Sequence, residues 1–192
     1  MSVRLLTVLV LAGLLQCEAA AAGIPCQPSR HEGSETVDKL LADLRQEADP
    51  ARANRIAGRV ISAWSQSGSA TVDLLLSSAE KAAGAGRNEA ALDLLDNAVA
   101  LAPGHPDGWN RRAALHYSMN RFDKAMADLA CVLVLEPRHF LAWSELAAIY
   151  RELDWKQQEF DALMQLLRIF PADREAQSRA GELAEELADR PL

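Results

Sequence analysis

The sequence is poor in aromatic residues and in clustered basic charge. Phe, Trp and Tyr together make up 5% of the 192 residues, and β-branched residues are sparse after residue 70. Alanine and leucine dominate the apolar content instead, and this composition favours helices over sheets. The net charge is -7, and no basic run exceeds the pair Arg111-Arg112. Because a nucleic-acid-binding protein needs a basic face, the composition argues against nucleic acid as a partner.

The sequence also lacks the motifs of common enzyme and metal sites. No two of its four histidines have a metal-ligand spacing on one helix, and no CxxC, nucleophile-elbow or glycine-rich phosphate motif occurs. His105 and His139 stand 34 residues apart, just after two prolines, which indicates a role in turns. We therefore predict a protein without catalytic activity, metal, cofactor or small-molecule substrate. The enzymatic alternative would use His116 with a neighbouring carboxylate.

The apolar run at residues 5–15 is too short to span a bilayer comfortably. It follows the single basic residue Arg4 and precedes an alanine-rich stretch that offers cleavage after Ala21 or Ala22. This order is typical of a secretory signal peptide, which we place at 1–22. We therefore expect an exported protein. The short signal and the Ala- and Arg-rich composition favour the bacterial periplasm as its location.

The three cysteines bear on anchoring and on disulfide formation. Cys17 closely follows the apolar run, as in a lipoprotein signal, but that signal needs a small preceding residue, and Gln16 is not small. Cys26 lies in the segment 23–35, which we expect to be a flexible linker, and Cys131 lies mid-helix among apolar residues. An exported chain meets oxidising conditions, so a disulfide between the latter two is permitted. The simpler expectation is a buried thiol at Cys131 and an unpaired one at Cys26.

Three prolines recur at intervals of 34 residues, and each ends an apolar helical stretch. They are Pro103, Pro137 and Pro171. A proline has no N–H and clashes with the preceding helical turn, so it terminates a helix. The same interval relates three further sets: Leu75, Trp109 and Trp143; Ala79, Ala113 and Ala147; and Leu95, Leu129 and Leu163. A fixed period of this length indicates stacked pairs of helices.

This pattern resembles the tetratricopeptide repeat family, whose unit is a pair of antiparallel helices. Three units match, at 72–105, 106–139 and 140–173. The family has a bulky apolar residue early in the first helix and small residues where the two helices cross, here the sets above together with Ala91 and Ala125. The resemblance implies an all-α fold, a right-handed α-solenoid of stacked helix pairs.

The phase of the repeat extends beyond these three units. Residues 36–71 place apolar residues at the core positions of the repeat, with Asp49 as a helix N-cap and Pro50 in the first turn. We expect a degenerate N-terminal helix pair there that packs against the array. Residues 174–190 match a first helix without a partner, and a polar final helix is typical of the cap of a solenoid.

In the family, the first helices of successive pairs line a concave groove that commonly receives a partner's peptide or helix. The resemblance therefore implies protein partners, with Tyr117 and Asn110 as the best anchors. The expected groove comprises Asp107, Asn110, Tyr117, Leu141, Ser144 and Arg151. The positions of the carboxylate clamp in chaperone-binding repeats correspond here to Leu76, Glu80, Arg111, Leu141 and Glu145. Only one of them is basic, so we expect no clamp for a partner's terminal carboxylate.

Three residues depart from the family pattern. Arg112 and His116 form an unusual polar pair, one helical turn apart, where a leucine and an aromatic are usual. A buried arginine needs a partner, and we expect an acidic residue from an adjacent helix, with Glu145 and Glu80 as the first candidates. Glu159 replaces a small residue in the third unit, which predicts a shifted helix crossing there.

These features favour a non-catalytic adaptor or scaffold of the bacterial cell envelope that binds a partner peptide or helix. The alternative is a lipid-anchored structural subunit of an envelope assembly. We expect contact with a membrane only if Cys17 is lipidated. A fold alone does not determine function, so the partner has to be inferred from the chemistry of the groove.

Overall fold

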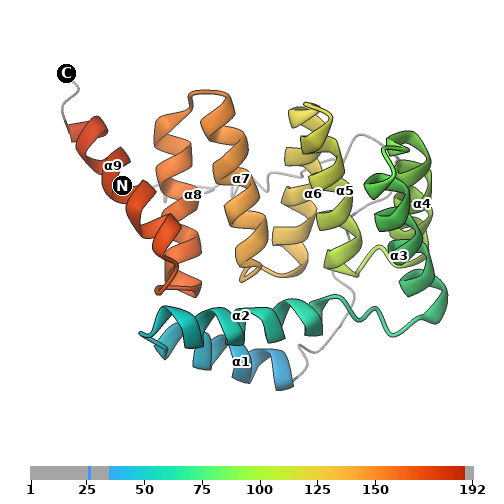
Figure 1. The fold of residues 1–192 in the computed structure, drawn as a ribbon, viewed down its shortest axis with the longest axis horizontal. Helices are drawn as coiled ribbons and strands as arrows, with labels where there is room; N and C mark the ends of the chain where they lie inside the picture. Colours follow the sequence, from blue (N-terminus) through green and yellow to red (C-terminus); the bar gives the residue numbers. More distant parts are fainter. Residues whose placement is uncertain (1–25, 27–34, 189–192) are drawn as a thin grey trace, which may run out of the picture.

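The computed structural model describes Cys26 and residues 35–188, and all regular elements in that part of the chain are helices (Figure 1). In chain order they are α1 (Glu35–Gln46), α2 (Pro50–Trp64), α3 (Ala70–Gly84), α4 (Asn88–Leu101), α5 (Pro106–Ser118), α6 (Phe122–Leu135), α7 (Phe140–Glu152), α8 (Lys156–Ile169) and α9 (Arg174–Ala188). The expected signal peptide at 1–22, its cleavage positions at Ala21 and Ala22, and Cys17 lie outside the described residues.

Helices α3 to α8 form three antiparallel pairs that stand side by side in a row, and α9 closes the row beside α8 (Figure 1). The pairs are α3 with α4, α5 with α6, and α7 with α8, one for each 34-residue unit. Consecutive pairs meet through α4 and α5 and through α6 and α7. This arrangement confirms the prediction of an all-α solenoid of stacked helix pairs.

The turn within each pair uses a left-handed backbone conformation at one repeat position. Gly86, Asn120 and Asp154 have φ angles of 72°, 56° and 55°. Glycine adopts such angles freely, and asparagine and aspartate tolerate them better than other residues. The N–H of the following residue donates to a carbonyl of the first helix, as in the 2.9 Å bond from Arg121 to the carbonyl of His116. This bond closes the helix end as in a Schellman motif.

The turn between successive pairs is held by a second repeated bond. A side-chain N–H six residues after each closing proline donates to the proline carbonyl: Trp109 Nε1 to Pro103 at 2.8 Å, Trp143 Nε1 to Pro137 at 3.1 Å, and Gln177 Nε2 to Pro171 at 2.6 Å. The proline carbonyls lie in the turn, two residues beyond the ends of α4, α6 and α8, and these side chains supply their donor. The recurring tryptophans therefore hold the turn together in addition to filling apolar space.

The core combines small residues at the helix crossings with larger apolar residues around them. Five alanines at the crossings are buried: Ala79, Ala91, Ala113, Ala125 and Ala147. The buried apolar residues fall into two clusters. The smaller cluster holds most of the α3–α4 residues together with Leu115 of α5, and the larger one extends from α5 to α9 and includes α1 and α2. The first unit thus packs partly apart from the rest of the array.

Helices α1 and α2 form a pair that lies across the ends of the later helices instead of continuing the row (Figure 1). Asp49 caps α2 by accepting the N–H of Arg52 at 2.8 Å, and Pro50 is the first helical residue. This confirms the predicted cap and the predicted position of the proline. The buried face of α2 consists of Ala53, Ala57, Val60 and Trp64.

Two contacts attach this N-terminal pair to the turn between α6 and α7. The indole of Trp64 stacks on the imidazole of His139, with ring centroids 4.2 Å apart. Asp38 of α1 accepts from Arg138 at 2.7 Å. His139 also caps α7 by accepting the N–H of Ala142 at 3.2 Å, which confirms that this histidine is a turn residue.

Helix α9 covers the end of the array with Ala176, Ala180 and Leu183. Its Arg179 donates to both carboxylate oxygens of Glu159 in α8, at 2.7 and 3.0 Å. Glu159 is 2% exposed, and a buried carboxylate needs such a partner. The departure of Glu159 from the repeat pattern is thus matched by an arginine from the next helix, a partner that the repeat pattern does not indicate.

Candidate functional site

Helices α3, α5 and α7, the first helices of the three pairs, share one face of the array, which we call the first-helix face. Helix α3 contacts α5, and α5 contacts α7. One cavity opens between α3, α4 and α5, and a second opens where α7 meets α8 and α9. This face contains the positions that the sequence assigns to the partner-binding groove.

Asn110 and Glu145 connect α5 to α7 on the first-helix face. The amide nitrogen of Asn110 donates to Glu145 Oε1 at 3.1 Å. Asn110 Oδ1 and Glu145 Oε2 are buried and have no hydrogen-bond partner among the described residues. Burial raises the pKa of Glu145 to about 7, and the charge of Asp107 adds to this effect. A proton on Glu145 would provide a donor where two acceptors are otherwise unsatisfied.

The other expected groove residues differ in how accessible they are. Tyr117 is partly buried against Phe122, with ring centroids 5.7 Å apart, and Leu141 packs partly buried against the larger core cluster. Ser144 and Arg151 are exposed and line the second cavity, which has a volume of about 90 Å³ and a polar wall. Their assignment to partner binding stays a prediction, and Ser144 and Arg151 are the more accessible members of the set.

Asp107 belongs to a chain of charges that links α3 and α5. It accepts from Arg111 Nε at 2.7 Å, and Nη1 of the same arginine donates to Glu80 at 3.1 Å. Glu80 comes from α3 and its side chain is 74% exposed, whereas that of Asp107 is 13% exposed. The one basic position among those corresponding to a carboxylate clamp is therefore already engaged by two acids of the protein itself.

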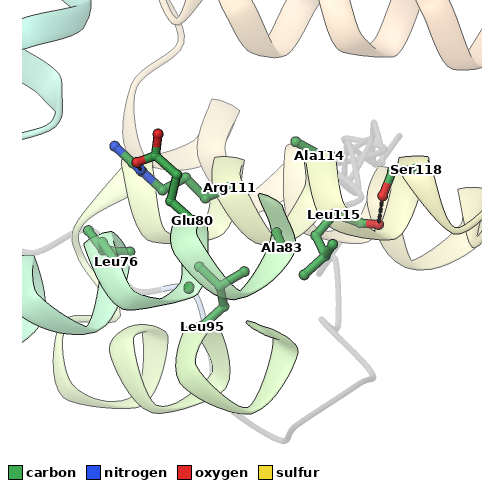
Figure 2. Close-up of a pocket in the computed structure, with 9 residues that line it drawn as sticks. Leu76, Glu80, Ala83, Leu95, Arg111, Ala114, Leu115 and Ser118 are labelled. Carbon is green, nitrogen blue, oxygen red and sulfur yellow. Dashed lines mark hydrogen bonds and ion pairs between the residues drawn. The ribbon is translucent and has the colours of Figure 1, made fainter. Parts of the chain in front are cut away.

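An apolar cavity of about 280 Å³ lies beside this chain of charges (Figure 2). Figure 2 shows the side chains of Glu80 and Arg111 meeting near Leu76, at one end of the residues that line it. Its apolar wall comprises Leu76, Ala79, Ala83, Leu95, Ala114 and Leu115. The volume is at the lower limit for cavities that hold small molecules, and the lining is apolar with charges at the edge. The repeat pattern does not indicate this cavity, because Leu95 and Leu115 come from different repeat units.

Arg112 is buried where α4, α5 and α6 meet. Its guanidinium donates to both carboxylate oxygens of Asp128, at 2.8 and 2.6 Å, and to Asp96 at 2.7 Å. The side chains of Arg112 and Asp128 are each 3% exposed, whereas Asp96 reaches solvent. The guanidinium also lies 4.9 Å from the ring centroid of Trp109. This bidentate, doubly paired geometry satisfies the charge of a buried arginine.

The prediction of an acidic partner for Arg112 from an adjacent helix is confirmed, but the two candidates named for it, Glu145 and Glu80, are wrong. Glu145 accepts from Asn110, and Glu80 accepts from Arg111. Both of these acids lie on the first-helix face, whereas the partners of Arg112 come from the second helices of its own and the preceding pair.

Asp128 could have been found from the repeat register. The residues 34 positions before and after it are Leu94 and Ala162. A carboxylate at a position that is apolar in both neighbouring units needs a compensating charge. Asp128 lies in the same repeat unit as Arg112, so these two departures from the pattern together indicate a buried ion pair.

His116 lies one helical turn after Arg112 and is 6% exposed. Burial lowers the pKa of its imidazole, although the negative charge of Asp128 opposes this shift. Its Nδ1 is buried without a hydrogen-bond partner among the residues that the structure describes. A general base has to reach its substrate, and this imidazole is enclosed in the joint between helices. The geometry therefore gives the enzymatic alternative no support.

Among Cys26 and residues 35–188, no group of three or more His, Cys, Asp or Glu side chains is placed to hold a metal ion. In the same residues no helix has both the length and the apolar character needed to cross a bilayer. Cys26 packs against the larger core cluster and Cys131 is buried in it, and no disulfide joins these two residues.

The fold and its repeated bonds define a helical-repeat protein with 34-residue units. A family model described as a tetratricopeptide repeat matches residues 82–149. A TPR repeat-containing protein from Rhizobium etli is 45% identical over 152 residues, which cover 79% of this chain and 74% of that relative. The chain therefore belongs to the tetratricopeptide repeat family.

Solved structures with the same fold include domains from several proteins. The first TPR of Spaghetti (RPAP3), bound to the HSP90 peptide SRMEEVD, has a TM-score of 0.57 at 19% identity and covers 62% of this chain and 97% of its own. The Sgt2 TPR domain from Aspergillus fumigatus scores 0.56 at 20% identity, covering 65% of this chain and 87% of its own. MamA scores 0.56 at 17% identity, covering 77% and 84%. At these identities the likeness shows the fold alone.

Proposed function

We propose that this protein is a non-catalytic interaction module, an adaptor or scaffold, that holds an extended segment of a partner protein on the first-helix face. The observation that carries this proposal is the apolar cavity between α3, α4 and α5, with Glu80 and Arg111 at its edge. Binding sites commonly combine an apolar lining with a few polar groups that orient the ligand. The peptide bound to the Spaghetti domain supports this use of the fold.

A protein segment suits this face better than a small molecule does. The cavity of about 280 Å³ is small, but the first-helix face continues from α3 through α5 to α7 and includes a second, polar cavity lined by Ser144 and Arg151. Repeat solenoids use such extended surfaces to bind elongated partners. A side chain can occupy the apolar cavity while the rest of the segment follows the face.

We also propose that the protein works in the bacterial cell envelope after export. The support comes from the sequence, in which the apolar run at residues 5–15 and the alanine-rich stretch after it are typical of a signal peptide. The alternative, a lipid-anchored structural subunit, is favoured by Cys17, which closely follows that run. The intact mass of the protein isolated from cells separates the two. A start at Ala22 or Gly23 supports the soluble form, and a lipid-modified Cys17 supports the anchored form.

The binding proposal is tested by locating a bound peptide on the surface. Peptides are selected from a random library on the immobilised full chain, and one is resynthesised with a photo-reactive residue. Cross-links to residues of α3, α5 and α7, identified by mass spectrometry, are the expected result. Failure to select any peptide, or cross-links confined to the exposed residues of α4, α6 and α8, would contradict the proposal.

A further inference from the structure

We propose that the cavity between α3, α4 and α5 selects a partner segment in which an apolar side chain stands next to a lysine or arginine. This inference rests on the proposed function, because it names the chemistry of the segment that the first-helix face would bind. Two independent observations carry it: the apolar lining of the cavity and the sign of the accessible charge at its edge.

The lining of the cavity suits an aliphatic or similar apolar side chain. Leu76 and Ala83 of α3, Leu95 of α4 and Leu115 of α5 converge on it, as Figure 2 shows. An apolar group placed among them loses its contact with water and leaves no polar group of the partner unsatisfied. A charged or amide side chain would lose its hydration there without a compensating bond. The cavity therefore favours an apolar residue at this point of the segment.

The accessible charge at the edge of the cavity is negative. Glu80 makes one ion pair, with Arg111, and its side chain is still 74% exposed. Arg111 is 32% exposed and is engaged by two carboxylates, those of Glu80 and Asp107. A cation from the partner can approach Glu80 from solvent, whereas a carboxylate would have to compete with two acids for one arginine. Complementary charge of this kind selects partners and suppresses wrong ones.

The next joint of the same face pairs an amide with an acid, Asn110 of α5 with Glu145 of α7. Asn110 is 7% exposed, and its Oδ1 has no donor among the described residues, as is also true of Glu145 Oε2. Acids therefore come from three successive first helices: Glu80 from α3, Asp107 from α5 and Glu145 from α7. Of these acids, Glu80 is the accessible one, and Arg111 beside it is already paired with two carboxylates. The exposed Arg151 lies farther along the face, on α7, so a basic residue next to the apolar anchor fits this part of the face best.

The test compares the wild-type chain with two variants and two matched controls. Ala114→Leu adds a larger side chain at an exposed position that lines the cavity. Ala90→Leu makes the same change at an exposed position of α4 outside the cavity. Glu80→Lys reverses the accessible charge, and Asp93→Lys makes an equivalent charge change on the exposed surface of α4. Circular dichroism and thermal unfolding verify that each variant is folded before binding is measured.

Peptides selected from a random library on the wild-type chain are expected to share an apolar residue beside lysine or arginine. The affinity of a selected peptide, measured by fluorescence anisotropy, should fall by about tenfold or more for Ala114→Leu, because burial of a leucine-sized side chain contributes at least that factor. Glu80→Lys should also weaken binding, and both controls should bind like the wild type.

Three results would overturn the inference while leaving the proposed function standing. They are selected peptides with acidic residues beside the apolar one, equal binding by Ala114→Leu and the wild type, and equal binding by Glu80→Lys and the wild type. A wild-type dimer that Ala114→Leu dissociates in light scattering would show that a second copy fills the cavity, and would also overturn it. A library that yields no binding peptide would reject the inference together with the proposed function.

Discussion

The second and third repeat units place different chemistry at equivalent positions. In the second unit, Arg112 is buried in a bidentate bond with Asp128 and a further bond with Asp96. In the third unit, the positions 34 residues after Arg112 and Asp128 hold Leu146 and Ala162, which are buried in the larger apolar cluster. The two members of this pair are thus both charged in the second unit and both apolar in the third.

The charged joint also lies close to the boundary between the two core clusters. The smaller cluster consists of α3 and α4 residues with Leu115, and Arg112 bonds across this boundary to Asp96 of α4. The cavity that we propose for partner binding lies among the same helices, α3, α4 and α5. The ion network therefore helps to set how the first unit meets the second, and with it the shape of the cavity.

The largest effect is expected from breaking the charged joint on one side. Arg112→Leu leaves Asp128 buried without its partner, and removal of one member of a buried pair costs about 3–5 kcal/mol. The free energy of unfolding, measured with urea, should fall by about this amount. The matched control is Arg55→Leu at an exposed position, which should change stability by at most about 0.5 kcal/mol. A loss of equal size in both variants would contradict the role given to the ion network.

The joint between the second and third units is expected to respond to pH through Glu145. Its pKa is raised to about 7 by burial, whereas the unfolded chain titrates near 4.5. Between these values the folded state holds a proton that the unfolded state releases, so stability falls as the pH rises through this window. The loss above pH 7 should be on the order of 3 kcal/mol.

Glu145→Gln isolates this effect because glutamine keeps an acceptor for Asn110 without a titrating group. The variant should match the wild type near pH 4 and exceed it in stability above pH 7. His116 and His139, whose pKa values are lowered by burial, reduce stability as the pH falls below about 6.5, and this contribution is common to both proteins. Parallel stability curves for the two proteins across this range would contradict the burial of the carboxyl group.

The repeated tryptophan bond should matter more in the second unit than in the third. Trp109 is 1% exposed, donates to Pro103 and lies beside Arg112, whereas the bond from Trp143 to Pro137 is exposed to solvent. Trp109→Phe should cost about 2 kcal/mol through a lost, partly buried hydrogen bond and poorer packing, and Trp143→Phe should cost about 1 kcal/mol or less. Urea unfolding of both variants measures the difference, and the reverse order would show that the two turns are not held as described.

The smallest effect is expected when the charged joint is converted into the apolar one. Arg112→Leu combined with Asp128→Ala installs the residues of the third unit, and apolar replacement of a buried ion pair is often neutral or stabilising. The double variant should therefore recover most of the loss of the single variant and lie within about 1 kcal/mol of the wild type. If the double variant is as unstable as Arg112→Leu alone, the third unit accepts an apolar pair because of the residues around it, and not because the two members match.

The periodic features of the chain could be predicted because each has a local physical cause. The prolines stop helices, the small residues allow close crossings, and Asp49 and Pro50 start α2. All of these properties are visible within one or two helical turns of the sequence. They were sufficient to predict the helix pairs and the all-α solenoid.

The side-chain partners could not be predicted from the period alone. Glu145 bonds to Asn110 and not to Arg112. The repeat phase gives the position of a residue on its helix, but it does not specify which way a long side chain extends. The apolar cavity likewise depends on residues from three helices, and the stacking of Trp64 on His139 follows from an N-terminal pair that lies across the array. These features arise from packing between units, which a repeat pattern does not encode.

The central claim is that the cavity between α3, α4 and α5 receives an apolar side chain of a partner segment. Backbone amide spectra of the isotopically labelled chain, recorded during titration with a selected peptide, test it most directly. The account predicts that the largest chemical-shift changes occur at Ala83, Ala114 and Ser118, which line the cavity on α3 and α5. Large changes confined to the exposed surfaces of α4 and α6, with none at these three residues, would contradict it.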